Sequence, residues 1–292
     1  MREFDNFVAI DWSGAKGPTQ SGIAIAVCSA DGGQPVLVER GQRWSRDEVL
    51  TVLRDDLPEN SLVGLDLGIG LPFADCGAFF PAWDGSPENA VELWELVDQQ
   101  SSDDPNLAAN GFLTHPDVQK YYHDGRAPGE EYHCDGAKHS GGRLRVTETA
   151  QARMGCKPYS NFRLVGAAQV GKSSLTGMRM LHRLRGHLPV WPIDPLPDTG
   201  SVIVEIYTAL AALEAGRSAG RTKLRTYAEL NDALAVLGSP PVSGDGAIDD
   251  HSSDALLTAA WLRAVAHEEA RWNPPALTPQ IAQTEGWTFG AI

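Results

Sequence analysis

The sequence predicts an α/β fold, because apolar runs of strand length alternate with longer segments that have the character of helices. Three of the strand-like runs end in a single carboxylate, and a long helical segment follows the last of them. The 292 residues, 42% of them hydrophobic, are enough to bury a sizeable core in one large domain or two small ones.

The N-terminal part of the chain, above all its first sixty residues, is predicted to be rich in strands. Four short apolar runs are the candidates: residues 7–11, 21–29, 35–44 and 61–68. The turn sequence Asp31-Gly32-Gly33 divides the second run from the third. A helix is expected over residues 45–56, because Ser45 can cap it and Glu48 can complete a capping box.

The rest of the chain is predicted to complete a single domain whose core is interrupted by a long insertion. The core covers residues 4–72 and 200–270, and the insertion covers residues 73–199, which are rich in Gly, Pro, Asp and aromatic residues. Residues 200–207 return to strand character. Four more helices are expected, at 86–99, 173–186, 226–237 and 250–269, the last with Asp250 as its cap.

The charge of the chain is unevenly distributed. The formal net charge is −14, which argues against a general affinity for DNA or anionic membranes. Residues 138–187, however, hold ten lysines and arginines and one acid, Glu148, a local charge of +9. Such a block predicts either a face that meets an anionic partner or a solvated helix face that acidic neighbours neutralise.

Several sequence features indicate a cytoplasmic protein without a membrane partner. No apolar run reaches the roughly 20 residues that cross a bilayer, and the N-terminal segment lacks the pattern of a secretory signal. The cysteines are widely scattered and are expected to be unpaired: Cys28, Cys76, Cys134 and Cys156.

Three predicted strands end in one carboxylate each, at Asp11, Asp66 and Glu205. If the strands are parallel neighbours, their ends lie about 4.8 Å apart and the carboxylates converge on one edge of the sheet. Close like charges raise each other's pKa unless a cation neutralises them. Mg²⁺ or Mn²⁺, which prefer oxygen ligands, would fill that role.

The last predicted helix adds Asp250, His251 and Asp254. Asp250 and Asp254 are spaced i, i+4 and share a helix face, and the apolar residues after Asp254 suit packing against a sheet. Four carboxylates around two ions about 4 Å apart would form a phosphoryl-transfer site. The alternative is that these acids are turn formers and helix caps, above all Asp250. The predicted metal ligands are Asp11, Asp66, Glu205, Asp250 and Asp254, and His251 joins the predicted catalytic residues.

The order of "AIDWSG", "GLDLGIGLP", "VEIY" and "DDHSSDALLTAAW" resembles the RNase H-like superfamily. In particular the chain resembles the domain-of-unknown-function family 429, whose members are predicted RNase H-like nucleases. The similarity extends over most of the chain and includes "LRVTE" and "GAAQVGKSSLTGM", while Thr208 stands where the family usually has a proline.

The resemblance implies a mixed five-stranded sheet of order 3-2-1-4-5, with strand 2 antiparallel, helices on its faces and a long insertion between strands 4 and 5. It also implies a Mg²⁺- or Mn²⁺-dependent nuclease acting on DNA or RNA. The stretch "HSSDAL" is similar to the closing motif of Holliday-junction resolvases of the RuvC type. On that likeness His251 and Asp254 would be metal ligands or their close helpers.

A second motif, Gly166–Ser173, matches the letters of a phosphate-binding P-loop. Residues 161–165 would be its strand, but they fall inside the insertion, whereas a P-loop normally follows a core strand. A nucleotide-binding NTPase therefore stays open as an alternative, as do a sugar-kinase or actin-like ATPase and a non-catalytic nucleic-acid-binding protein. A further interpretation is that Lys172, Arg179 and Arg183 bind nucleic-acid phosphates beside the metal site.

Overall fold

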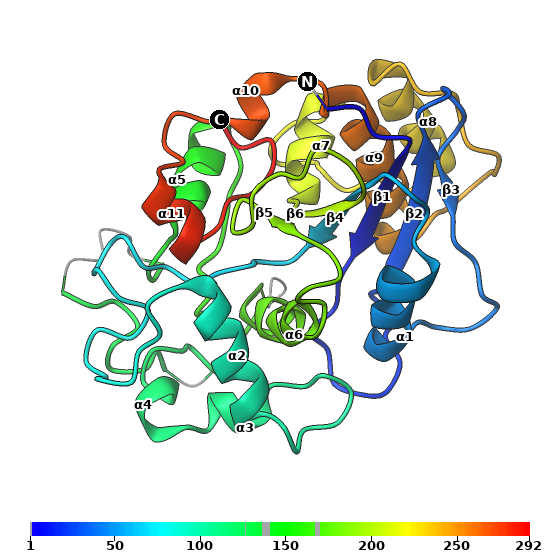
Figure 1. Cartoon of the computed structure of the whole chain (residues 1–292). Coiled ribbons are helices and arrows are strands. Elements are labelled where there is room, and N and C mark those ends of the chain that lie inside the picture. The colour runs from blue at the N-terminus through cyan, green and yellow to red at the C-terminus, as the bar shows by residue number, and fades with distance from the viewer. Residues whose placement is uncertain (1, 126, 136–140, 167–169) are drawn as a thin grey trace.

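A mixed six-stranded sheet forms the centre of the protein (Figure 1), in the order β3-β2-β1-β4-β6-β5. The computed structural model of the chain describes residues 2–125, 127–135, 141–166 and 170–292. The strands are β1 (Asn6–Asp11), β2 (Ala24–Ser29), β3 (Val36–Leu37), β4 (Ser61–Asp66), β5 (Val190–Trp191) and β6 (Val202–Glu205). β2 is antiparallel to β1 and β3, whereas β1, β4, β6 and β5 are mutually parallel neighbours. The predicted α/β class is confirmed.

The sheet has one strand more than the five predicted. The additional strand β5 comes from the predicted insertion and pairs with β6 at the edge of the sheet. Its two residues are too few to show an alternating pattern, so no sequence signal marked them. The other five strands lie in the expected relative order, although β3 covers only two residues of the predicted run 35–44.

Side chains alternate between the two faces of the sheet, as the strand period of two requires. On β1, Phe7 and Ala9 join one hydrophobic cluster, and Val8 and Ile10 join the other. The first face is covered by α7 (Thr208–Glu214), α8 (Tyr227–Val236) and α9 (Asp250–Val265), with α9 lying across β1 and β2. The second is covered by α1 (Arg46–Thr51), α2 (Ala90–Gln100) and α6 (Val170–Arg183).

The helix boundaries confirm some of the predicted capping residues and correct others. Ser45 caps α1 and forms the predicted capping box with Glu48, after which the chain continues as a short π-helix, Val52–Asp56. The cap of α9 is Asp249, not Asp250, because the Asp249 carboxylate accepts the Ser252 amide. The remaining helices are α3 (Asn110–Leu113), α4 (Pro116–Gln119), α5 (Val146–Arg153), α10 (Glu269–Trp272) and α11 (Pro279–Thr284).

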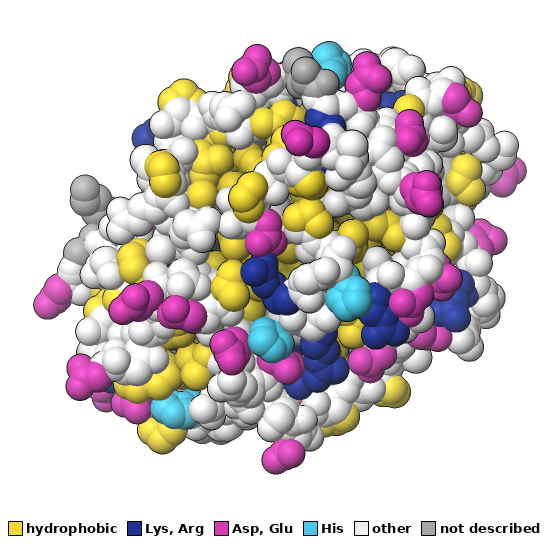
Figure 2. All heavy atoms as spheres, in the orientation of Figure 1, with side chains coloured by type: hydrophobic (Ala, Val, Ile, Leu, Met, Phe, Trp, Pro, Cys, Tyr) yellow, Lys and Arg dark blue, Asp and Glu magenta, His cyan; other side chains and the backbone are white. Residues whose placement is uncertain are grey.

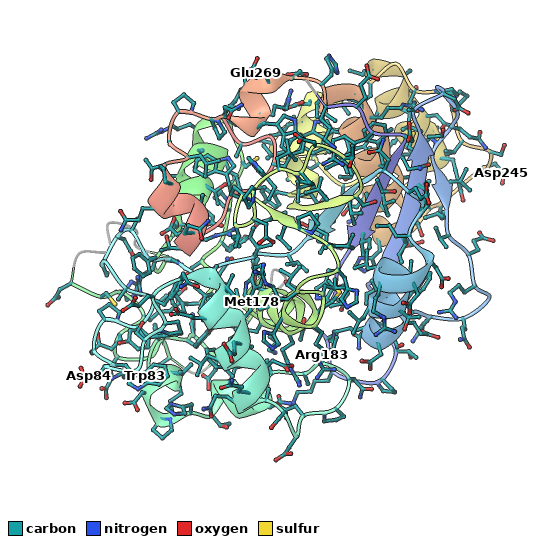
Figure 3. All side chains as sticks on the ribbon, viewed as in Figure 1. Trp83, Asp84, Met178, Arg183, Asp245 and Glu269 are labelled. Carbon is teal, nitrogen blue, oxygen red and sulfur yellow. The ribbon has the colours of Figure 1, made fainter. Side chains whose placement is uncertain are left out.

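The predicted insertion packs directly on the sheet. α2 lies against α6, with the buried Met178 of α6 beside α2 (Figure 3), and both helices share one hydrophobic cluster with β1 and β4. The chain then returns at its C-terminal end, where the Phe289 amide donates to the Glu205 carbonyl at the end of β6. All four cysteines are unpaired, as expected. No helix within the described ranges is long and apolar enough to cross a membrane.

The basic block does not form one exposed cationic face. Acidic side chains are spread over the surface in Figure 2, whereas basic ones gather in a few places on that face. Three of the block's arginines are fully buried and paired with acids: Arg143 with Asp75, Arg145 with Glu148 and Glu205, and Arg179 with Asp98. Acidic partners inside the fold therefore neutralise these three arginines. Lys138, also in the block, lies outside the described residues.

Candidate functional site

The carboxyl ends of β1 and β4 bring two of the predicted acids together. Asp11 and Asp66 are direct partners in the parallel register of the two strands. Their side chains project to the face that α9 covers, since they follow the parity of Ala9 and Gly64, and a Cβ on Gly64 would touch Leu262 of α9. The predicted convergence of these two carboxylates at one sheet edge is confirmed.

Glu205 projects to the opposite face. It is paired with Leu65, one residue before Asp66, so its side chain follows Leu65 into the cluster beneath α2 and α6. The one-residue shift in register turns Glu205 away from Asp11 and Asp66, but Glu205 still lines a cavity that Asp66 and Asp254 also line, and its charge helps to raise the pKa of Asp66.

Helix α9 delivers the two remaining residues of the site. Its first turns cross the end of β1, where His251 Nδ1 lies 2.7 Å from Asp11 Oδ2. Asp254, one turn further along α9, is buried and electrostatically coupled to Asp11 and Asp66. Asp250, the first residue of α9, has a weaker influence on the pKa of Asp254 than Asp11 has.

A lysine that sequence reasoning missed lies among these carboxylates. Lys223 Nζ is 2.5 Å from Asp254 Oδ2, and its charge also acts on Asp66 and His251. Lys223 belongs to the loop before α8, and no spacing or periodicity links it to the strand ends. Its side chain remains 49% exposed, whereas that of Asp254 is 8% exposed.

Three carboxylates, those of Asp11, Asp66 and Asp254, share the site with a single lysine, Lys223. Burial raises the pKa of Asp66 well above its usual value, and the charges of Asp11 and Asp254 raise it further. Burial also raises the pKa of Asp254, to about 6, although Lys223 opposes the shift. Burial alone would lower the pKa of Lys223, but the nearby acids, Asp254 first, raise it overall.

His251 is the second basic group of the site. The hydrogen bond with Asp11 raises the pKa of His251 above its ordinary value, against the effect of partial burial. Its ring is 44% exposed, so it lies at the edge of the site rather than beneath it.

The site opens into a cavity of about 490 Å³. Asp66, Asp254 and Lys223 form part of its wall, and Tyr159 and Tyr207 lie on the same wall. The hydroxyl of Thr208, which replaces the proline usual in the resembled family, is 3.5 Å from Asp66 Oδ2. The cavity therefore gives a ligand of small-molecule or nucleotide size access to the carboxylates.

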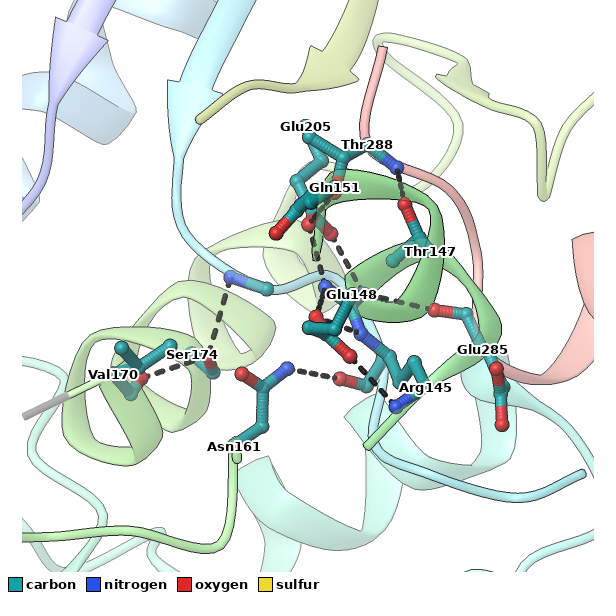
Figure 4. Close-up of polar contacts among 12 residues, drawn as sticks. Arg145, Thr147, Glu148, Gln151, Asn161, Val170, Ser174, Glu205, Glu285 and Thr288 are labelled. Atoms are coloured by element: carbon teal, nitrogen blue, oxygen red, sulfur yellow. Dashed lines mark hydrogen bonds and ion pairs between the residues drawn. The ribbon is translucent and has the colours of Figure 1, made fainter. Parts of the chain in front are cut away.

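Glu205 is fully engaged within the protein, which corrects its prediction as a metal ligand (Figure 4). Arg145 holds it through two bonds, 2.6 Å to Oε1 and 2.8 Å to Oε2. The Thr288 hydroxyl donates to Oε1 at 2.5 Å, and the Ile69 amide donates to Oε2 at 2.8 Å. With its two oxygens accepting from these four donors, Glu205 anchors the end of β6 and has no role left as a ligand.

The residues that would hold a metal ion do not form a ready-made cage. Across the described ranges, no group of three or more His, Cys, Asp or Glu side chains is arranged to hold an ion. Instead the ammonium of Lys223 provides the positive charge beside Asp254. The carboxylates of Asp11, Asp66 and Asp254 nevertheless influence one another electrostatically, and oxygen is the donor type that Mg²⁺ and Mn²⁺ prefer.

The three predicted phosphate contacts have different environments. Arg179 is fully buried, with Nε 2.9 Å from Asp98 and further bonds to backbone carbonyls, so it cannot reach a substrate; its predicted role is wrong. Arg183 is partly exposed and pairs with the same Asp98 at 3.3 Å. Lys172 lines a second cavity.

The structure around Lys172 does not support the P-loop interpretation. Residues 161–165 make only an isolated bridge, Arg163 to His123, and form no core strand. Lys172 is in the first turn of α6, and residues 167–169 of the motif lie outside the described residues. Gly14 packs on this turn so closely that a Cβ there would be 2.4 Å from the Ser173 amide nitrogen. Gly14 therefore covers part of the N-terminus of α6, a region that a P-loop protein leaves open for phosphate.

Comparison of the chain with protein-family models, with curated proteins and with solved structures finds no match. The resemblance to the domain-of-unknown-function family 429 and its RNase H-like fold therefore rests on the quoted motifs.

The crowded carboxylates give a prediction for stability. Because the pKa of Asp66 is raised in the folded protein, ionisation of Asp66 destabilises the fold above the unfolded pKa of about 3.9. Asp66→Asn is therefore expected to raise the melting temperature at pH 7, by roughly 2–4 °C for each kcal/mol gained. The gain should shrink toward pH 4, where the wild-type carboxyl is protonated as well.

Thermal unfolding followed by circular dichroism between about pH 4 and pH 8 measures this effect. Asp232→Asn, on the exposed side of α8, is the matched control and should leave the melting temperature unchanged. A less stable Asp66→Asn protein at pH 7 would contradict the assigned crowding.

Proposed function

We propose that this protein is a divalent-metal-dependent nuclease of RNase H-like type, in which Asp11, Asp66 and Asp254 hold the metal. The observation that supports the proposal is the gathering of these three carboxylates, from β1, β4 and α9, beside one cavity. A protein keeps such a destabilising cluster most readily where a cation binds.

The proposed ligands are three of the five predicted ones. Glu205 leaves the predicted set, because Arg145 occupies its carboxylate, and Asp250 stays a candidate at the edge of the site. Mg²⁺ or Mn²⁺ would supply the polarisation of a phosphoryl oxygen and the activation of water. His251, fixed by Asp11 and partly exposed, is placed to exchange a proton with a bound substrate or with solvent.

Lys223 has a defined part in this proposal. Without a metal it partly neutralises Asp254, and its half-exposed side chain can swing toward solvent when a divalent ion takes its place. A lysine is suited to this exchange because its stem is flexible and its ammonium is well hydrated.

Metal binding tests the proposal without any assay of activity. Titration calorimetry with Mn²⁺ should detect binding to the wild type, and Lys223→Met should bind Mn²⁺ at least about tenfold more tightly. The reason is that the ion must displace Lys223 from Asp254, and opposite charges about 4 Å apart attract by on the order of a few kcal/mol at an effective dielectric constant of about 20.

Lys223→Arg, which keeps the charge, is the matched control and should not show the gain. Absence of Mn²⁺ binding in both the wild type and Lys223→Met would refute the metal site. Incubation of the wild type with labelled DNA and RNA strands in Mn²⁺ then tests hydrolysis directly. Binding of strands without cleavage under any metal would favour a non-catalytic nucleic-acid-binding protein.

A further inference from the structure

A second cavity, of about 410 Å³, lies beside the carboxylate site. Its walls are the β1–β2 loop (residues 12–23), residues 105–113 and the first turns of α6. Three cationic side chains line it, Lys16, Arg46 and Lys172, and none of its described lining residues is an Asp or Glu. The chain as a whole has a net charge of −14, so this pocket differs from the rest of the protein. Its cationic side chains favour the binding of an anion.

Arg46 is the buried component of this cavity. Its side chain is 1% exposed, and it donates from Nε to the Ser13 carbonyl at 2.9 Å and from Nη1 to the Asn106 carbonyl at 2.6 Å. A further bond reaches the Ala15 carbonyl. Arg46 therefore ties both walls of the cavity together.

The charge of Arg46 is poorly compensated. It forms no ion pair with a carboxylate anywhere in the part of the chain that is described, and burial lowers its pKa to about 10 despite the opposing effect of Asp47. Three of its five N–H groups are used by carbonyls, which leaves donors for a further acceptor. A buried guanidinium in this state is stabilised by an anion that enters beside it.

The opposite wall is strained and partly apolar. Asn106 and Leu107 both have left-handed backbone angles, with φ of 57° and 55°, a costly conformation for residues other than glycine. This turn aims the Asn106 carbonyl at Arg46. Next to it, Leu113 and Leu175 give the cavity an apolar surface. Cations together with an apolar wall fit a nucleotide, whose phosphate and base require one of each.

The two cavities adjoin. Gly14 and Ala15 of the β1–β2 loop belong to the lining of both, so one chain of phosphates and bases can occupy them together. We propose that the second cavity binds a nucleotide unit of a single nucleic-acid strand through Lys16, Arg46 and Lys172, while the strand passes the carboxylate site. This assignment rests on the proposed nuclease function for its choice of ligand.

Strand binding in a chelator tests the assignment separately from catalysis. The full chain is titrated with a labelled single-stranded DNA oligonucleotide in excess EDTA, and fluorescence anisotropy reports the Kd. The variants are Lys16→Ala, Lys172→Ala and their combination, with Lys120→Ala, partly exposed and outside both cavities, as the control. Thermal unfolding verifies that each variant is folded, and Arg46 is left intact because it holds the walls together.

Each lysine variant is expected to weaken binding about tenfold, since a charged hydrogen bond contributes roughly 1.5–3 kcal/mol. The slope of log Kd against log salt should fall by about 0.7 for each phosphate that a variant no longer binds. Unchanged Kd in the double variant, an equal weakening in Lys120→Ala, or no strand binding by the wild type would each overturn the proposal. So would tight binding of ATP or inorganic phosphate alone, without binding of the strand.

The outcome for catalysis is read independently. Lysine-dependent strand binding by a wild type that cleaves nothing in Mn²⁺ would refute the nuclease and retain the strand site. A double variant that binds the strand with the wild-type Kd and still cleaves it in Mn²⁺ would retain the nuclease and refute the strand site.

Discussion

Asp11→Asn and Asp254→Asn are each expected to reduce Mn²⁺-dependent cleavage by roughly 10³-fold while the protein stays folded. The metal supplies several kcal/mol of transition-state stabilisation, and about 1.4 kcal/mol corresponds to a factor of ten in rate. Both side chains lie at the convergence of β1, β4 and α9, so loss of one charge weakens the whole ligand set. Initial rates on a labelled strand, with thermal unfolding as the test of folding, measure the effect.

Asp232→Asn, on the exposed side of α8, is the matched control. Asp232 lines neither cavity, so an unchanged rate of cleavage is expected. Cleavage at the wild-type rate in both Asp11→Asn and Asp254→Asn would remove the carboxylate cluster from the mechanism.

Arg145→Met is expected to destabilise the protein by roughly 3–5 kcal/mol, the usual cost of removing one partner of a buried ion pair. Arg145 is buried between Glu148 and Glu205 and also donates to the Glu285 carbonyl at 3.0 Å, as Figure 4 shows in part. Without it both glutamates would be left in the interior without a counter-charge. Urea unfolding followed by tryptophan fluorescence gives the change in the free energy of unfolding.

A second substitution separates charge from packing in this cluster. Adding Glu205→Gln to Arg145→Met should recover part of the loss, because one of the two uncompensated charges is removed. Arg153→Met, exposed on the same helix α5, should change stability by less than about 0.5 kcal/mol. The double variant is compared with the two single variants, Arg145→Met and Glu205→Gln. If its loss of stability equalled the sum of the two single losses, Glu205 and Arg145 would stabilise the fold independently.

Much of the sheet and part of the site follow from local patterns in the chain. Five of the six strands are apolar runs bounded by turn residues, and the capping box of α1 is visible as Ser45 and Glu48. The carboxylates Asp11 and Asp66 follow such runs directly, so parallel pairing of β1 and β4 is sufficient to bring them together. Asp254 could be predicted for a similar reason, since its helix has the apolar composition that packs against a sheet.

Glu205 shows where this reasoning fails. Its run looks like those of Asp11 and Asp66, yet the register of β4 with β6 places it opposite Leu65 and turns it to the other face. Register depends on contacts along the whole strand, and a change of one residue reverses every side chain. No local pattern in the sequence specifies it.

The sequence by itself thus determined the alternating elements, the strand-end aspartates and the helix that carries Asp254, because each depends on residues a few positions apart. The tertiary structure alone decided which charges meet. Lys223 reaches Asp254 across 31 positions and Arg145 reaches Glu205 across 60, while Arg46 is enclosed by carbonyls of two separate loops. Such pairings arise from the packing of distant segments, where electrostatic energy depends on distance and burial rather than on spacing along the chain.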